Sequence, residues 1–225
     1  MTALALFDLD HTLLDGDSDD LWCRFLVRHG LVNADIQQRN AQMLADYGSG
    51  KVSVEAYSGF YARLLANRTP SEWAHWQDRF LAEEIMPRLP PTARALVDSH
   101  RRAGHTPVLT TASNRVIAER TAAELGFAQF LSTELALAND VFTGEVRGTP
   151  NMRDGKLARI QAWLQEQDLP ENALDSAWFY SDSINDLPLL SAVGHPVAVN
   201  PDKQLLQHAL TKGWPVLDIL GQSSP

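Results

Sequence analysis

The chain has little cysteine, few basic residues and no long apolar run. Its 225 residues contain one cysteine, Cys23, which excludes an internal disulfide and a thiolate metal cluster and suits a reducing cytosol. Its place in an amphipathic pattern is typical of a small buried hydrophobic residue. No stretch approaches the about 18 apolar residues of a membrane span. The opening apolar run is interrupted by Asp8 and follows no basic leader, so we expect no secretory signal and a cytoplasmic location.

Basic residues are fewer than acidic ones. The 19 Lys and Arg against 28 Asp and Glu give a formal net charge of -9, which disfavours a nucleic-acid partner because phosphate contacts need a basic face. An anionic substrate must therefore meet local positive charge. The length and the 44% hydrophobic content are ordinary for a globular protein with one domain and a substantial insertion. The sequence does not indicate an oligomeric state.

What the sequence does have, at its start, is the apolar run 3–7 followed by Asp8 and Asp10. The run predicts a strand buried in a parallel sheet, and ligands of open α/β sheets bind outside the carboxyl ends of such strands. Two carboxylates about 4 Å apart repel by about 4 kcal/mol at an effective dielectric near 20. Mg²⁺ would offset this repulsion. The alternative is that Asp8 only ends the strand and Asp10 only starts a turn.

From residue 17 to residue 87 the pattern is helical. Leu21, Trp22, Phe25 and Leu26 form one apolar stripe, and no strand-like alternation is present. Further helices are predicted at 34–47, 53–66 and 71–86, each bounded by polar residues, Gly or Pro. We therefore expect an all-helical module at 17–87, inserted after the first strand.

Beyond residue 87 strands and helices alternate. Such repeated units predict an α/β fold with a doubly wound parallel sheet covered by helices. The residues 221–225 are expected to be a disordered tail. The predicted elements are strands at 106–111, 177–181 and 196–199, a hairpin of 132–137 with 141–146, and helices at 92–103, 115–125, 155–167, 187–192 and 202–212.

Polar groups that could reach the same crevice occur in three later segments. A hydroxyl cluster at 110–114 follows a strand and opens a helix, which suits phosphate binding, although an ordinary helix N-cap gives the same pattern. Asp182 and Asp186 follow another predicted strand. Between the hydroxyl cluster and Asp182 in the chain lies Lys156, whose alternative interpretation is a solvated helix lysine.

Taken together, these segments resemble the signature of a known family. The order Asp8-x-Asp10-x-Thr12, Thr111, Lys156, Asp182-x-x-x-Asp186 resembles the four motifs of the haloacid dehalogenase (HAD) superfamily, the aspartate-nucleophile phosphotransferases. The helical insertion after the first motif looks like subfamily IB, which contains phosphoserine phosphatase. The resemblance implies a HAD-like Rossmannoid core at 1–16 and 88–225, with a C1-type helical cap at 17–87.

The resemblance also implies a role for each matching residue. Asp8 would be the nucleophile that forms an aspartyl-phosphate, and Asp10 the general acid and then the base. Mg²⁺ would be held by the Asp8 carboxylate, the Asp10 carbonyl and Asp182, with Asp186 nearby. The phosphoryl group and the substrate would be bound by Thr111, Ala112, Ser113, Lys156 and Asn185.

Two departures from the family pattern concern Ser181 and Asp17. Ser181 stands where the family often has Gly, and Asp17 stands where phosphoserine phosphatases commonly carry a glutamate that contacts the substrate's amino group. Asp17 would still meet an ammonium group, although a helix N-terminus explains the acidic run 15–20 as well. Further candidates for substrate contact in the insertion are Trp22, Arg39, Arg63 and Arg68.

The predicted function is Mg²⁺-dependent phosphatase activity, the hydrolysis of a phosphoric monoester. Family members that cleave carbon–halogen bonds lack the second aspartate, so Asp10 favours phosphate ester chemistry. The expected substrate is a small phosphorylated metabolite such as an amino acid or amino alcohol phosphate, with the insertion acting as a lid. The alternatives are a phosphotransferase or mutase of the same superfamily and, from another class, a phospho-accepting receiver-type signalling domain.

Overall fold

A computed structural model describes residues 2–221 of the chain. Its centre is a six-stranded, wholly parallel sheet in the order β3-β2-β1-β6-β7-β8. The predicted doubly wound α/β fold is therefore confirmed, while residues 222–225 of the expected disordered tail lie outside the described residues. The strands are β1 (Leu4–Phe7), β2 (Thr106–Asn114), β3 (Gln129–Thr133), β6 (Trp178–Ser181), β7 (His195–Val199) and β8 (Val216–Leu217).

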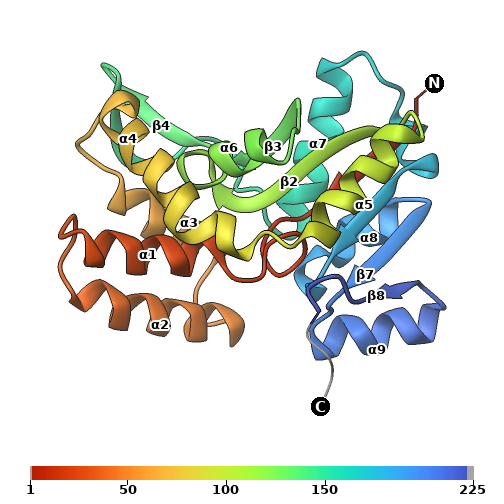
Figure 1. Ribbon diagram of the computed structural model, residues 1–225, viewed down its shortest axis with the longest axis horizontal. Coiled ribbons are helices and arrows are strands. Elements are labelled where there is room, and N and C mark those ends of the chain that lie inside the picture. The colour runs from red at the N-terminus through yellow and green to blue at the C-terminus, as the bar shows by residue number, and fades with distance from the viewer. Residues whose placement is uncertain (1, 222–225) are drawn as a thin grey trace.

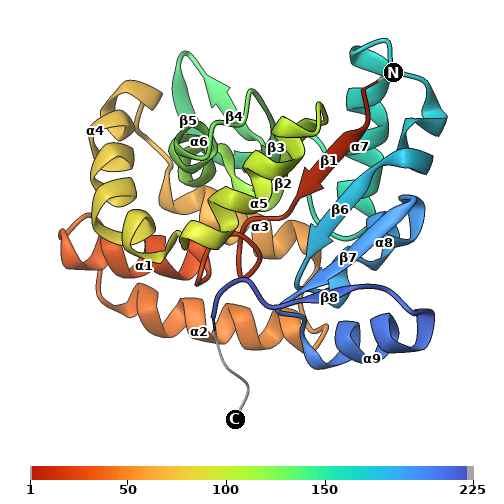
Figure 2. The ribbon, with the colours of Figure 1, turned by 45° about the vertical axis from the view of Figure 1, so that its right-hand side comes forward.

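Strand β1 is central because both of its faces are buried. Leu4 and Leu6 contribute to one apolar cluster, while Ala5 and Phe7 contribute to the cluster on the opposite face. Two helices, α5 (Pro91–Arg102) and α6 (Arg115–Glu124), contribute to the Phe7 cluster. The Leu6 cluster includes side chains of α7 (Asp154–Glu166), α8 (Leu187–Ala192) and α9 (Lys203–Lys212). The sheet thus carries helices on both faces (Figures 1 and 2).

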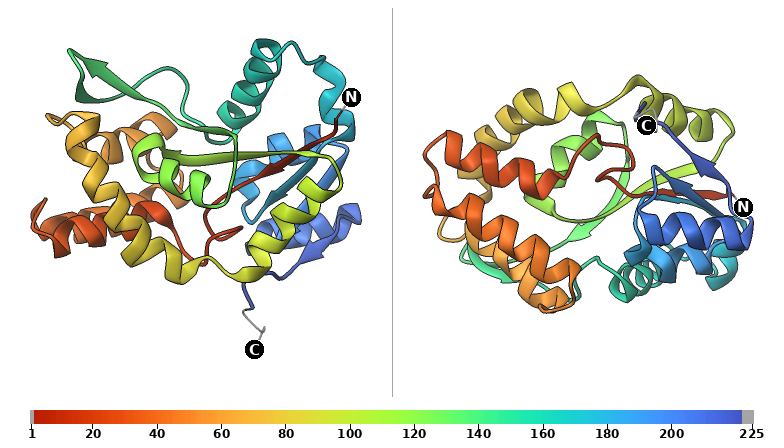
Figure 3. Two further views of the ribbon diagram at one scale, coloured as in Figure 1. Left: turned by 45° about the horizontal axis from the view of Figure 1, so that its top comes forward. Right: turned by 90° about the horizontal axis from the view of Figure 1, so that it is seen from below.

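Residues 17–87, between β1 and α5, form helices joined by short turns, as predicted. In all views they gather at the end of the molecule opposite β7, β8 and α9 (Figures 1 and 3). Helix α4 begins in a capping box, since Thr69 and Glu72 each accept a hydrogen bond from the other's main chain, with Pro70 at the first helical position. The elements are α1 (Ser18–Arg28), α2 (Asp35–Gly48), α3 (Val54–Leu64), α4 (Pro70–Phe80), a π-helical turn (Leu81–Ile85) and a 3₁₀ turn (Met86–Arg88).

The predicted hairpin is wrong in its first strand. Residues 132 and 133 belong to β3, where Thr133 pairs with Asn114 of β2, and the hairpin itself is β4 (Leu135–Ala138) with β5 (Val141–Val146). The run 132–137 has no turn residue, but it contains the end of β3 and the whole of the next strand but its last residue, with Glu134 between the two strands. Asn139 and Asp140 both have positive φ, as a tight hairpin turn requires. The short strand β8 was not predicted either.

The β4–β5 hairpin contacts the helical segment. The Asn67 N–H donates to the Phe142 carbonyl at 2.9 Å, and the Phe142 N–H donates to the Arg68 carbonyl at 3.0 Å. A Cβ at Gly144 would lie 3.0 Å from Ala66 Cβ, and Gly144 has φ of 85°, so only glycine fits there without strain. The hairpin therefore braces α3 against the sheet domain.

Among the described helices, none combines the length and the apolar character that crossing a bilayer would require.

Candidate active site

The polar segments meet at the carboxyl end of the sheet. Asp8 and Asp10 follow β1, and Asp182 and Asp186 follow the adjacent β6. They line a cavity of about 220 Å³ together with side chains from the helical segment. Parallel strands end at one edge, so residues 174 positions apart meet through the topology of the sheet. The lining residues are Asp8, Asp10, His11, Asp17, Asp19, Leu44, Tyr47, Tyr57, Ala112, Met152, Arg153, Lys156, Asp182, Ser183, Asn185 and Asp186.

Lys156 is the buried cation of this cavity. Its Nζ lies 2.8 Å from Asp8 Oδ1 and 2.7 Å from Asp186 Oδ2, and only 2% of the residue is exposed. Burial lowers the pKa of Lys156, but the carboxylates of Asp186 and Asp8 more than offset this and raise it. Burial also raises the pKa of Asp8 to about 6, a rise that Lys156 limits. The alternative of a solvated lysine is wrong.

Asp10 is held by the segments on either side of it. The Ser18 N–H donates to Asp10 Oδ1 at 2.7 Å, and Ser113 Oγ donates to Asp10 Oδ2 at 3.0 Å. Burial, followed by the negative charges of Asp17 and Asp8, raises the pKa of Asp10 to about 7. Asp10 can therefore carry or release a proton near neutral pH, as a general acid or base must.

Asp8 and Asp182 face one another across Thr12. The Thr12 hydroxyl lies 3.3 Å from Asp8 Oδ2 and 3.3 Å from Asp182 Oδ1. Burial and the charges of Asp8 and Asp186 raise the pKa of Asp182 well above its usual range. Over residues 2–221, no three His, Cys, Asp or Glu side chains are grouped closely enough to hold a metal ion. The available pair still fits Mg²⁺, which takes one or two carboxylates and completes its shell with water and phosphate.

The second motif lies deeper than the others. Thr111 is fully buried, and its Oγ1 accepts the Ser113 N–H at 3.2 Å. The Asn151 side-chain amide donates to the Thr111 carbonyl at 2.8 Å and so fixes the end of β2 against the segment that leads to Lys156. Of the residues 110–114, Ala112 alone lines the cavity as the structure stands.

Asp186 and Asn185 occupy the turn after β6. Asp186 Oδ2 accepts from Lys156 and, at 2.7 Å, from Ser181 Oγ. The serine in place of the family's usual glycine therefore supplies a hydrogen bond to the Asp186 carboxylate. Asp186 forms an ion pair with Lys156 in this structure, so its part in metal binding remains a prediction. Asn185 lines the cavity, as expected.

Arg153 is a cavity residue that the motifs do not indicate. Its backbone has φ of 50° and ψ of -129°, a strained conformation for a residue with a side chain, and its guanidinium lies 4.6 Å from the Tyr47 ring centre. Its Nε is buried without a hydrogen-bond partner. Gly155 allows this turn, because a Cβ there would lie 2.3 Å from the Pro150 carbonyl oxygen. The proximity to Lys156, three residues on, is the only sequence signal.

The helical segment contributes two carboxylates and two tyrosines, Tyr47 and Tyr57, to the cavity. Asp17 is the N-cap of α1, since its Oδ1 accepts the Asp20 N–H at 2.8 Å, and it also lines the cavity. The helix-capping interpretation of Asp17 is therefore confirmed, while its contact with a substrate ammonium group remains a prediction. Asp19 also lines the cavity; it is 6% exposed, its Oδ1 has no partner, and burial raises its pKa well above the usual range.

The other candidates from the insertion do not reach the cavity. Trp22 is fully buried against Phe25 and Phe80, and the Arg68 guanidinium lies over Trp73. The remaining two residues, Arg39 and Arg63, are absent from the cavity lining as well. Amphipathic spacing predicts which residues of a helix are buried, but it does not predict whether they pack in the hydrophobic core or line a ligand cavity.

The sequence and the fold are similar to those of a family of hydrolases. The sequence matches the family model described as haloacid dehalogenase-like hydrolase over residues 5–191, so the chain belongs to this family. The histidinol-phosphatase of Neisseria meningitidis serogroup C (strain 8013) is 39% identical over 220 residues, which cover 97% of this chain and 99% of the relative. The phosphoserine phosphatase SerB1 of Mycobacterium tuberculosis H37Rv is 30% identical over 224 residues, 97% of this chain and 71% of that protein.

Solved structures are similar over the same range. A protein of unknown function from Bordetella pertussis Tohama I has a TM-score of 0.93 at 38% identity, covering 97% of this chain and all of that one. A substrate-bound phosphoserine phosphatase has a TM-score of 0.68 at 15% identity over 97% of this chain and 93% of its own, a likeness of fold. The predicted superfamily and enzyme class, a phosphatase, are confirmed.

Proposed function

We propose that this hydrolase is a Mg²⁺-dependent phosphomonoesterase that acts through an aspartyl-phosphate on Asp8. The observation that carries the proposal is the pairing of Asp8 with Lys156 at 2.8 Å beside Asp10, a carboxyl group whose pKa is raised to about 7. Asp8 is thereby available for nucleophilic attack, and Asp10 is available for proton transfer. Electrostatic stabilisation by fixed cations and donors suits the charge on a transferring phosphoryl group.

In the proposed reaction Asp8 attacks phosphorus, and the bond from phosphorus to the ester oxygen breaks. Asp10 donates its proton to the leaving oxygen and then takes a proton from the water that hydrolyses the aspartyl-phosphate. Lys156 and main-chain N–H groups near Ala112 and Ser113 would hold the phosphoryl oxygens. Thr111 would position that loop from its buried place.

Asp8, Asp182 and the Asp10 carbonyl would hold the metal. When bound, Mg²⁺ would neutralise charge on the phosphoryl oxygens and relieve the repulsion between the carboxylates. The raised pKa of Asp182 supports this assignment, because it reflects burial first and then the negative charges of Asp8 and Asp186, both of which a bound cation would offset.

The charge of the cavity favours a substrate with a cationic part. Six carboxylates line it against Arg153 and Lys156. Burial raises the pKa of Asp17 and of Asp19, and an ammonium or imidazolium group on the substrate would stabilise the charged forms of both carboxyl groups. The relatives named histidinol-phosphatase and phosphoserine phosphatase agree with an amino alcohol or amino acid phosphate.

Residues 17–87 would form the cap over this site. The cavity-lining side chains of α1, α2 and α3 support a lid that excludes water during phosphoryl transfer. The cytoplasmic location expected from the sequence remains a prediction.

The test is turnover of p-nitrophenyl phosphate with Mg²⁺ by the wild type and by Asp8→Asn. We expect the variant to lose at least about 10⁴-fold, because the covalent route is removed. The control is Asp98→Asn, on an exposed part of α5, which should keep wild-type activity. Equal rates for the wild type and Asp8→Asn would contradict the proposal.

The phosphotransferase or mutase alternative remains within the family. It predicts that an added alcohol or sugar becomes phosphorylated at the expense of free phosphate, which product analysis measures. The receiver-type alternative is contradicted, because the chain belongs to a family of hydrolases.

A further inference from the structure

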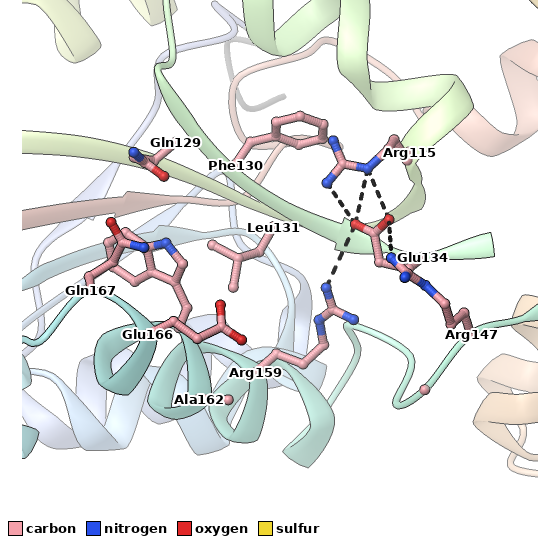
Figure 4. Close-up of a pocket in the computed structure, with 12 residues that line it drawn as sticks. Arg115, Gln129, Phe130, Leu131, Glu134, Arg147, Arg159, Ala162, Glu166 and Gln167 are labelled. Carbon is pink, nitrogen blue, oxygen red and sulfur yellow. Dashed lines mark hydrogen bonds and ion pairs between the residues drawn. The ribbon is translucent and has the colours of Figure 1, made fainter. Parts of the chain in front are cut away.

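A second and larger cavity of about 800 Å³ lies apart from the Asp8 site and shares no lining residue with it. It opens between β3 and α7, at the edge of the parallel sheet (Figure 4). Arg115 of α6, Arg147 of the segment after β5 and Arg159 of α7 point from three directions toward one carboxylate, that of Glu134. The sequence motifs gave no indication of this cluster.

The three guanidinium groups are unequally paired. Arg115 Nη2 lies 2.8 Å from Glu134 Oε1, and its Nε lies 2.9 Å from Oε2. The Arg147 main-chain N–H donates to the Glu134 carbonyl at 2.8 Å, but the nearest guanidinium nitrogens of Arg147 and Arg159 stay 3.7 Å and 3.8 Å from the Glu134 carboxylate, beyond hydrogen-bond distance. One carboxylate thus satisfies one arginine and leaves the hydrogen-bonding capacity of two others largely unused toward the cavity.

Arg159 is the most constrained of the three. Its Nη1 donates to the Thr149 carbonyl at 3.2 Å, while its Nε is buried without a partner. Burial lowers the pKa of Arg159, and Arg115 and Arg147 lower it further, while Glu134 and Glu166 oppose this. Three guanidinium groups thus face two carboxylates, Glu134 and Glu166, in this cavity, and an anion beside the arginines would lower their mutual repulsion.

The rest of the cavity has a different character. The Arg115 guanidinium lies 4.4 Å from the Phe130 ring centre, and Leu131 and Trp163 supply apolar surface beside it. Gln129 and Gln167 lie at the far side from the arginines (Figure 4). Glu166 also lines the cavity, so the lining is mostly polar with one apolar wall, and a ligand that fits it needs both a charged group and an apolar part.

We propose that this cleft binds a small organic anion whose carboxylate or phosphate group lies between Arg147 and Arg159 and whose ring or chain lies against Phe130, Leu131 and Trp163. The ligand's oxygens would take the free donors of both arginines and leave the Arg115–Glu134 pair in place. Bidentate contact with guanidinium groups would select carboxylate or phosphate over other polar groups.

The cleft is connected to the phosphatase site through two short paths. Arg159 lies three residues beyond Lys156 on the same helix, α7. Glu134 follows Thr133, which donates to the Ala112 carbonyl at 2.7 Å and accepts the Asn151 N–H at 3.1 Å. A bound anion would therefore alter the position of α7 and of the Ala112 loop, and so the kinetics of the reaction. This second part rests on the proposed function.

The binding test uses isothermal titration calorimetry with two probes, benzene-1,3-dicarboxylate and phenylphosphonate, which separate the carboxylate from the phosphate-like source. The titrated protein is the full chain carrying Asp8→Asn, so no turnover occurs. We expect at least one probe to bind, with an affinity reduced about tenfold or more by Arg159→Gln and by Arg147→Gln, as loss of a charged hydrogen bond requires.

The Arg147 side chain is 71% exposed, so Arg147→Gln should fold normally, and a lower affinity in this variant would not be caused by misfolding. Arg39→Gln, 60% exposed on α2, is the matched control and should leave the affinity unchanged. Absence of binding by both probes, or equal affinity for the wild-type cleft and both arginine variants, would overturn the site. These results do not depend on activity, so they stay distinct from failure of the proposed function.

The coupling is tested by turnover of p-nitrophenyl phosphate in protein with Asp8 intact. A saturating probe should change kcat or KM in the wild type and leave Arg147→Gln unaffected. If the probe binds through the arginines but both constants stay unchanged, the coupling is overturned while the binding site stands.

Discussion

Lys156 Nζ and Asp186 Oδ2 lie 2.7 Å apart with both side chains almost wholly buried, at 2% and 6% exposure. The pair, with Asp8 on the other side of the ammonium, joins α7 to the turn after β6. Its loss would leave two carboxylates buried without a cation, so Lys156 bears on stability as well as on catalysis.

Lys156→Met is expected to lower the free energy of unfolding by about 3–5 kcal/mol near neutral pH, because it removes the cation from a buried cluster. Urea unfolding followed by circular dichroism measures this. The control Lys51→Met removes a 72% exposed ammonium 3.7 Å from Asp46 and should change the free energy by less than about 0.5 kcal/mol. Equal stability of the two variants would show that the Lys156 cluster is not needed for folding.

Asp10→Asn is expected to slow both halves of the reaction, because the amide can neither donate the proton nor take it back. For 2-aminoethyl phosphate, whose leaving alkoxide needs that proton, the rate should fall by about 10²–10⁴. With p-nitrophenyl phosphate the first half should suffer less, since its leaving group is a stable anion. Stopped-flow absorbance should then show a burst of p-nitrophenolate, and a burst-free, unchanged rate would refute the role of Asp10.

Asp17→Asn separates charge recognition from helix capping. Asparagine retains the N-cap hydrogen bond to Asp20, so the stability should stay close to that of the wild type. The KM for 2-aminoethyl phosphate should rise roughly 10-fold to 100-fold, as loss of a charged hydrogen bond implies, while the KM for ethyl phosphate should not change. Asp35→Asn, 57% exposed on α2, is the control. A parallel rise in both KM values would argue against ammonium recognition.

His100 should make stability depend on pH away from the active site. It is 7% exposed, with Nε2 2.7 Å from Tyr180 Oη and Nδ1 2.8 Å from His105 Nδ1. Burial and then His105 lower its pKa from 6.5 to about 4. The native state thus keeps His100 neutral while the unfolded state takes up a proton, so its contribution is present above pH 6.5 and is lost as the pH falls toward 4.

The expected slope from His100 is up to about 1.4 kcal/mol in the free energy of unfolding per pH unit within that window. Urea unfolding at a series of pH values measures it. His100→Gln should remove this part of the slope, whereas the control His75→Gln, at an exposed position of α4, should keep it. Identical slopes in the wild type and His100→Gln would contradict the assignment.

The sequence alone predicts those elements that follow from hydrophobic periodicity and those site residues that stand at the ends of strands. An apolar run ending in Asp8, and another ending in Asp182, lie beside each other because parallel strands share one carboxyl edge. The helices of residues 17–87 could also be predicted from the sequence, because their apolar residues recur at helical spacing and turn residues lie at their ends.

The remaining features depend on contacts between distant segments. The division between β3 and β4 at Glu134 is set by pairing with β2, which no local pattern records. The strained backbone of Arg153 follows from packing around Gly155. The cleft joins Arg115, Arg147 and Arg159 from three elements, so its charge becomes visible only in the folded chain.

The central claim is that Asp8 becomes phosphorylated during turnover. Acid quenching of Asp10→Asn during reaction with a phosphate ester and Mg²⁺, followed by peptide mass spectrometry, measures this directly. We expect one added phosphoryl group on the peptide that contains Asp8, and none when Asp8→Asn is added to the same protein. Turnover with the Asp8 peptide unmodified, or a phosphoryl group on another residue, would contradict it.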